Sequence, residues 1–112
     1  MRRSSAARAL RHSAPTFAAL GDETRLRLVT RLCEEGPLSI TRLAEGSQVS
    51  RQAVTKHLRV LADAGLVAGA RDGRENVWKI EPSALADARA DLEAISKHWG
   101  ETLLRLRVFV ES

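Results

Sequence analysis

The stretch SRQAVTKHLRVLADAGLV, residues 50–67, decides the fold because its apolar residues recur at helical spacing and then meet a glycine. At 100° per residue, Val54, Leu58 and Leu61 fall on one side of the predicted helix. Gly65 predicts its end, since glycine readily adopts the conformation of a C-terminal cap. The other side is polar and largely basic, and it carries Arg51, Gln52, Thr55, Lys56 and Arg59.

A shorter helix is predicted directly before this stretch, separated from it by a tight turn. Ser39 can cap the short helix and Ser50 the longer one, because serine side chains accept hydrogen bonds from the free N–H groups of a first turn. Gly46 marks the turn between them. The short helix is expected to bury Ile40, Leu43 and Ala44.

Two further helices are predicted upstream, one over residues 15–20 and one after Gly21. Asp22 can cap the second, and Gly36-Pro37 predicts its end because proline cannot continue helical hydrogen bonding. Its apolar stripe is expected to contain Leu26, Val29, Leu32 and Cys33. Cys33 is the only cysteine, and its position favours a small core residue over a redox or metal-binding thiol.

A small β-hairpin is predicted after the long helix. Residues 66–71 and 76–80 are compatible with strands, and Asp72-Gly73 between them is a strong signal for a hairpin turn. Pro82 and Ser83 then predict the start of a last helix. The β structure is thus expected to be a two-stranded ribbon.

The last predicted helix, over about residues 83–110, has an apolar stripe along almost its whole length. Its apolar residues follow at spacings of three and four, namely Leu85, Ala88, Leu92, Ile95, Trp99, Leu103, Leu106 and Val110. Such a helix is about 40 Å long, more than so small a domain can cover. We therefore expect part of the stripe to contact another chain. Gly100 fits either a bend or a close helix contact.

Length and composition indicate one small domain. The chain has 112 residues, of which 44% are hydrophobic, and no stretch approaches the roughly 20 apolar residues that span a bilayer. Its opening residues lack the apolar core of a signal peptide, so we expect a soluble, cytoplasmic protein. We divide it into a basic, flexible arm over residues 1–13 and a domain over residues 14–112.

Basic charge gathers in the arm and in the middle of the chain. Residues 1–12 carry four arginines and no acid, which accounts for the formal net charge of +4. Residues 51–79 hold six Lys or Arg against three acids, whereas residues 80–112 hold four against six. The arm is compatible either with a solubilising tail or with a segment that binds along DNA.

The predicted order of helix, tight turn, helix and hairpin is the layout of a winged helix-turn-helix in a mainly α protein. The major groove of duplex DNA admits one α-helix, whose outer side chains can reach base edges. Arg51, Gln52 and Thr55 have the chemistry of base readers, whereas Lys56, Arg59 and Ser50 suit phosphate contacts. An ordinary solvated helix surface is the alternative on charge alone.

Three segments together resemble the ArsR family of bacterial winged-helix repressors, namely FAALGDETRLRLV, PLSITRLAEGSQVSRQAVTKHLRVLADAGLV and RDGRENVWKI. The resemblance runs from Phe17 to Ile80 and implies that the helix after Ser50 is the recognition helix. It implies that the wing lies over residues 71–79, with Arg74 nearest its tip. It also makes His57, which position alone favours as a packed residue, a candidate DNA contact. The candidate DNA contacts are Gln48, Ser50, Arg51, Gln52, Thr55, Lys56, His57, Arg59, Arg71 and Arg74.

The resemblance further implies a homodimer whose interface is formed by the first and last helices, in agreement with the long apolar stripe. Two-fold symmetry then predicts a palindromic operator in double-stranded DNA. The candidate interface residues are Phe17, Leu20, Leu92, Ile95, Trp99, Leu103, Leu106 and Val110, with Trp99, Leu103 and Leu106 at the centre.

The metal-binding patterns that the resemblance associates with many relatives are missing from this sequence. The short helix before the turn has no Cys or His. In the last helix, His98 and Glu101 at i and i+3 are the one arrangement that could contribute two ligands. A transition-metal site usually needs three or four ligands. No phosphate loop, CxxC pair or catalytic carboxylate arrangement occurs either. We therefore expect no metal, no cofactor and no enzymatic activity.

The sequence as a whole predicts a homodimeric repressor that an unknown signal, such as a small-molecule effector, releases from DNA. Two alternatives stay open. One is a winged helix that binds another protein instead of DNA, and the other is a metal- or redox-responsive repressor. Activation in place of repression is also open, because the sign of regulation depends on where the operator lies.

Overall fold

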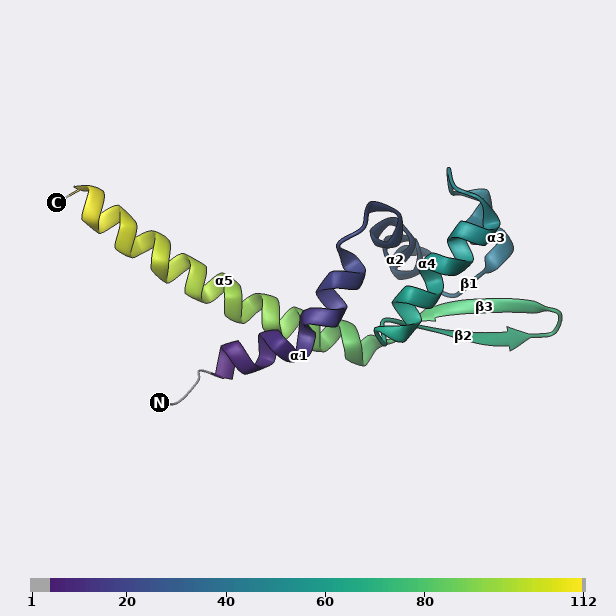
Figure 1. The fold of residues 1–112 in the computed structure, drawn as a ribbon, viewed down its shortest axis with the longest axis horizontal. Helices are drawn as coiled ribbons and strands as arrows, with labels where there is room; N and C mark the ends of the chain where they lie inside the picture. Colours follow the sequence, from purple (N-terminus) through teal and green to yellow (C-terminus); the bar gives the residue numbers. More distant parts are fainter. Residues whose placement is uncertain (1–4, 112) are drawn as a thin grey trace.

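The computed structural model describes the backbone of residues 5–111 and the side chains of residues 13–111. A helical unit with a small sheet lies at one end, and the last helix projects away from it (Figure 1). The whole measures 64 × 30 × 20 Å. In chain order the elements are α1 Ser5–Leu20, α2 Glu23–Glu35, β1 Leu38–Ser39, α3 Ile40–Glu45, α4 Arg51–Asp63, β2 Val67–Asp72, β3 Glu75–Ile80 and α5 Pro82–Glu111.

The helix-turn-helix pair α3 and α4 forms as predicted. The Ser39 side chain accepts a hydrogen bond from the backbone N–H of Arg42, and Ser50 accepts one from Ala53 at 3.1 Å. Gly65 follows the end of α4 with a φ of 79°, a left-handed conformation that costs glycine little. These local signals therefore set both ends of α4.

The core lies between α4 and the elements around it. Val54, Leu58 and Leu61 on the inner face of α4 are completely buried, with Leu43 of α3 and Leu66 before β2. Such side chains contribute about 1.5–3 kcal/mol each through burial. The inner face of α4 is thus fixed by packing, which leaves its outer face available for other contacts.

The sheet has one strand more than predicted. β1 pairs antiparallel with β3, which also pairs with β2, so that the order is β1-β3-β2. A strand of two residues is too short to show alternation, and only its tertiary pairing reveals it. Within the hairpin, Gly69 lies opposite Trp78, and a Cβ at Gly69 would lie 3.1 Å from the indole. Glycine therefore leaves room for the ring.

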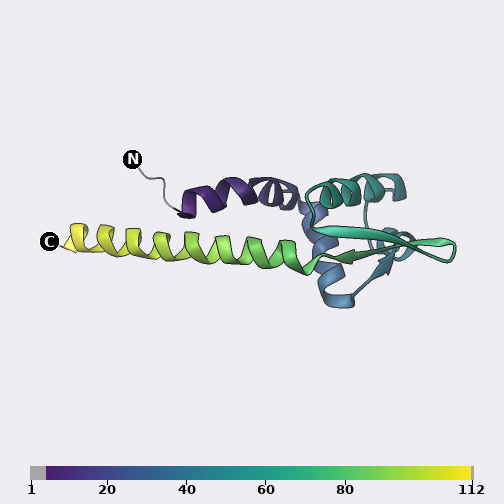
Figure 2. The same cartoon turned by 90° about the horizontal axis from the view of Figure 1, so that it is seen from below.

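Helix α1 is longer than predicted, because it begins at Ser5 and not at Pro15. The residues before Pro15 include several alanines and arginines, which favour helix, and Pro15 lies inside α1 because a proline can bend a helix without ending it. Residues 1–4 of the predicted arm lie outside the described residues. Buried Ser13 donates a hydrogen bond to Asp91 of α5. Figure 2 shows α1 lying along α5.

Two residues predicted for the buried stripe of α2 are exposed. Leu28, Val29 and Leu32 are buried, whereas Leu26 is 50% exposed and Cys33 is exposed. At 100° per residue, Leu26 and Cys33 lie roughly 90° or more from the centre of the buried face. The prediction that Cys33 is a core residue was therefore wrong. No helix within residues 5–111 is both long and apolar enough to cross a membrane.

Candidate nucleic-acid interface

The outer face of α4 presents the predicted polar side chains to solvent. Arg51, Gln52, Lys56 and Arg59 are exposed, and Thr55 is half-buried. The Thr55 hydroxyl donates to the backbone carbonyl of Arg51 at 3.0 Å, so the hydroxyl is already engaged within the helix. The methyl group is the part of this side chain that the hydrogen bond leaves unengaged. Four long or amide side chains and one methyl thus project from a helix whose opposite face is fully packed.

The beginning of α4 combines a cap with a positive helix end. Because the Ser50 oxygen accepts the Ala53 N–H, its hydroxyl proton is left to donate to another acceptor. The first N–H groups of a helix and its dipole favour a negative group at this end. A phosphate beside Ser50 therefore meets a donor and a favourable field.

The second half of α3 is held by an arginine that no sequence pattern singled out. Arg31 of α2 donates from Nη1 to the carbonyl of Arg42 at 3.2 Å and to that of Leu43 at 3.1 Å. Gly46 lies against this guanidinium so closely that a side chain there would clash with it. Gln48, a predicted DNA contact, is exposed in the turn between α3 and α4. Arg31 thus ties the end of α3 to α2.

His57 points to α2 with one of its ring nitrogens. Its Nδ1 lies 3.3 Å from Arg25 Nη1 and 3.8 Å from Asp22 Oδ2, and its side chain is 25% exposed. This half-buried site agrees with the packed residue that position alone favours. Nδ1 is therefore not a group that α4 offers to DNA. Arg25 is the second residue of this region that sequence reasoning missed, because no spacing distinguishes it from its neighbour Arg27.

Asp22 is the cap of α2 and the anion of this cluster. Its carboxylate accepts the backbone N–H of Arg25 at 3.0 Å, and this hydrogen bond is the main reason that the pKa of Asp22 lies below its usual value. The positive charge of Arg25 acts in the same direction, as does that of His57 when its ring is protonated. The charged form of Asp22 is therefore the one that the fold favours.

We expect Asp22→Asn to reduce the dependence of folding stability on acid pH. With its pKa lowered by folding, Asp22 stabilises the native state above its unfolded-state pKa of about 4, and this contribution is lost as pH falls through the folded-state pKa. Asparagine still caps a helix but does not titrate. Urea unfolding at about pH 6 and about pH 3 measures the loss. A loss as large in the variant as in the wild type would contradict this role, and Asp63→Asn serves as the control.

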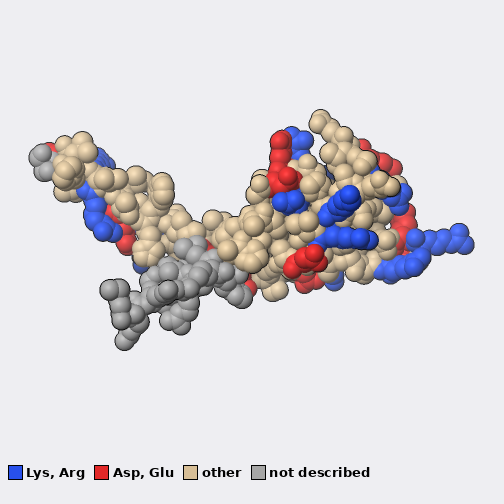
Figure 3. Space-filling model, viewed as in Figure 1, with Lys and Arg blue, Asp and Glu red and all other residues tan. Residues whose placement is uncertain are grey.

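The wing carries basic side chains along its length, and Arg74 lies in its turn. Gly73, with a φ of 63°, and Arg74 form the two-residue turn between Asp72 and Glu75. Arg71, Arg74 and Lys79 are exposed, and Figure 3 shows basic side chains reaching out at this end of the molecule. The hairpin thus places positive charge beside the helix-turn-helix unit.

The outer half of α5, residues 97–111, exposes a large apolar surface. Of the predicted interface residues, Phe17, Leu20 and Ile95 are half-buried, and Trp99 is 67% exposed. Figure 3 shows this part of the helix as mostly uncharged. Leu104, Val108 and Phe109 are exposed as well, although they lie outside the predicted stripe. The exposed large apolar residues on the stripe are Leu92, Trp99, Leu103, Leu106 and Val110.

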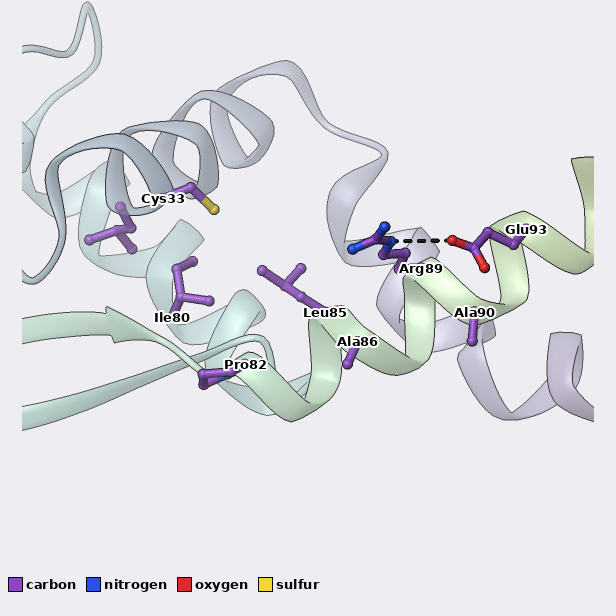
Figure 4. A pocket seen from close by; sticks show the side chains of 9 residues that line it. Cys33, Ile80, Pro82, Leu85, Ala86, Arg89, Ala90 and Glu93 are labelled. Carbon is purple, nitrogen blue, oxygen red and sulfur yellow. Dashed lines mark hydrogen bonds and ion pairs between the residues drawn. The ribbon is translucent and has the colours of Figure 1, made fainter.

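Cys33 borders an open groove between α2 and the first half of α5 (Figure 4). The groove has a volume of about 720 Å³, and Ile80 and Leu85 are among its apolar lining residues. Arg89 and Glu93 form an ion pair of 3.3 Å at its edge. On the exposed part of α5, His98 Nδ1 lies 3.9 Å from Glu101 Oε2. Among the described residues, no three His, Cys, Asp or Glu side chains converge as metal ligands would.

Comparison with known proteins places this arrangement among transcriptional regulators. A family model for a helix-turn-helix domain matches residues 20–70. The HTH-type transcriptional regulator Rv2034 of Mycobacterium tuberculosis is 38% identical over 96 residues, which cover 86% of each chain. An ArsR-like transcriptional regulator from Rhodococcus sp. RHA1 has a similar structure, with a TM-score of 0.70, 36% identity and coverage of 86% of this chain and 90% of that one.

A third comparison concerns the fold alone. The homodimeric winged helix-turn-helix DNA-binding domain Mb0332 from Mycobacterium bovis matches with a TM-score of 0.65 at 21% identity. The match covers 87% of this chain and 89% of that one. The three-stranded sheet and the order of the helices are thus those of a winged helix-turn-helix domain.

Proposed function

We propose that this chain, which belongs to the ArsR family of winged helix-turn-helix transcriptional regulators, is a homodimeric repressor that reads a palindromic operator. The observation that carries the proposal is the outer face of α4. Its side chains are exposed and basic or amide-bearing, while its inner residues Val54, Leu58 and Leu61 are completely buried. Such a helix can enter the major groove without loss of core packing.

The side chains of α4 divide by chemistry into two kinds of contact. Gln52 can pair with adenine N6 and N7, and Arg51 with guanine O6 and N7. Lys56, Arg59 and the Ser50 hydroxyl suit phosphate oxygens, which position the helix without reading sequence. Arg71 and Arg74 extend this positive surface along the wing. Substitution of a base-contacting residue should therefore change sequence preference, whereas substitution of a phosphate-contacting residue should weaken binding to all duplexes alike.

Two observations support a homodimer. The outer half of α5 exposes Trp99, Leu103 and Leu106, and apolar surface of this extent commonly marks an interface. The matching domain Mb0332 is itself homodimeric. A two-fold axis presents two copies of α4 to two half-sites, so the binding energies of the two helices act together. Occupation of a promoter by such a dimer would exclude the transcription machinery.

The salt dependence of binding tests whether this chain contacts DNA as proposed. Fluorescence anisotropy with a labelled duplex should show an affinity that falls linearly with salt on logarithmic axes, because each phosphate contact releases counterions. An affinity independent of salt, or no binding to any duplex, would contradict the proposal.

In the same titration, we expect Lys56→Ala to flatten the salt dependence. Each lost phosphate contact lowers the logarithmic slope by about 1, so a dimer that loses two should show a decrease of about 2. Affinity should fall by a similar factor for operator and unrelated duplexes. Lys97→Ala removes an exposed lysine from α5 and is the matched control. A selective loss for the operator alone would instead make Lys56 a base reader.

A further inference from the structure

Arg25, a residue of α2, contacts α1 and α4 through its guanidinium group, and its backbone N–H takes part in the cap of α2. Its Nε donates to the carbonyl of Ala19 in the last turn of α1 at 2.6 Å. Its Nη1 lies 3.3 Å from Nδ1 of His57 on α4, and its backbone N–H caps α2 through Asp22. One residue of α2 thus contacts the end of α1, its own helix cap and the middle of α4.

The chemistry of this contact determines the protonation pattern of His57. A guanidinium group has only donors, so a hydrogen bond with Arg25 requires a lone pair on Nδ1. The neutral ring then carries its proton on Nε2. Among the described residues, every buried side-chain nitrogen has a hydrogen-bond partner. Nε2 of His57 has no such partner in this part of the chain, so it is not buried. Nε2 is therefore open to solvent.

Arg25 lies between two parts of the molecule with different proposed functions, the dimerisation helices α1 and α5 and the reading helix α4. α1 packs along α5, where buried Ser13 donates to Asp91, and these two helices carry the proposed dimer surface. α4 carries the proposed reading surface. The contacts of Arg25 with Ala19 of α1 and His57 of α4 thus join the two parts.

We propose that Arg25 is a positioning residue that holds the reading helix α4 at a fixed placement relative to the dimerisation helix α1. In a dimer this placement sets the distance between the two copies of α4, and hence the spacing of half-sites that the protein accepts. The inference rests on the proposed function. It adds that spacing is selected by a contact remote from the DNA, whereas the sequence of each half-site is read by the outer face of α4.

The test compares wild type, Arg25→Gln and Arg25→Lys on duplexes whose half-sites are separated by different spacers. Arg27→Gln is the matched control, because Arg27 is exposed on the same helix, where it pairs with Glu23. This substitution removes the same charge as Arg25→Gln. We expect Arg25→Gln to reduce discrimination between the preferred spacer and spacers one or two base pairs longer by about tenfold, since two-site binding depends on matched geometry. Affinity for a duplex with one half-site should stay close to that of Arg27→Gln.

Arg25→Lys keeps the charge and can still reach one acceptor, but it lacks the planar fork that serves Ala19 and His57 together. It should therefore lose spacing discrimination as Arg25→Gln does, and it provides a folded variant if the glutamine protein is unstable. Long-range nitrogen–proton NMR of free wild-type protein should find the His57 proton on Nε2. A proton on Nδ1 of neutral His57, or equal spacing profiles for the Arg25 and Arg27 variants, would overturn the proposal. Wild type that binds no duplex would contradict the proposed function itself.

Discussion

Replacement of both Arg51 and Gln52 by alanine should abolish preference for the operator while the protein remains folded. Each correct pair of hydrogen bonds to a base edge contributes about 1–3 kcal/mol of discrimination, and a dimer makes each contact twice. We therefore expect the ratio of operator to unrelated-duplex affinity to fall at least about 100-fold. Both side chains are exposed in α4, so their loss should hardly affect the core.

Anisotropy titrations with an operator duplex and a shuffled duplex of the same composition measure this ratio. Arg89→Ala is the control for a lost arginine, because Arg89 is exposed on α5. Thermal unfolding of each variant verifies that the fold is retained. If the double variant keeps both the affinity and the sequence preference of wild type, the outer face of α4 is not the reading surface.

The second large effect is expected at the outer half of α5. Leu103→Asp with Leu106→Asp places two carboxylates in the centre of the proposed interface, where they would lose hydration without a partner. Sedimentation should show a monomer where wild type is a dimer. A monomer engages one half-site at a time, so operator affinity should fall at least about 100-fold.

Arg105→Asp is the matched control for this pair, because it introduces a carboxylate on the same exposed part of α5 but outside the apolar stripe. It should leave the sedimentation of the protein unchanged. A dimer that survives both leucine substitutions would contradict the placement of the interface on this stripe.

The parts of the fold that depend on neighbouring residues were predictable from the sequence. Ser39, Ser50 and Asp22 cap the helices that they were predicted to cap, because an N-cap acts within its own first turn. The buried face of α4 also followed from its spacing, since Val54, Leu58 and Leu61 repeat along one side of a regular helix. The asymmetry of α4, and with it the candidate reading face, therefore follows from the spacing of its residues alone.

The features that depend on distant contacts were not predictable. β1 consists of two residues and exists because Leu38 and Ser39 pair with β3 about forty residues later. The bridge from Arg25 to His57 spans 32 positions and leaves no periodic signal. Cys33 follows the buried Leu32 in the sequence, but its angle on α2 turns it to the groove beside α5. Local sequence patterns define the helices, whereas the contacts between them depend on tertiary packing.

The central claim, that this chain is a dimer that reads DNA through two copies of α4, is tested most directly by selection from a randomised duplex pool. The purified protein is incubated with the pool at near-physiological salt, and the retained duplexes are sequenced. The account predicts enrichment of an inverted repeat whose half-site centres lie about 10 base pairs, or a multiple of this distance, apart. A pool that stays unenriched, or that yields a motif without two-fold symmetry, would contradict it.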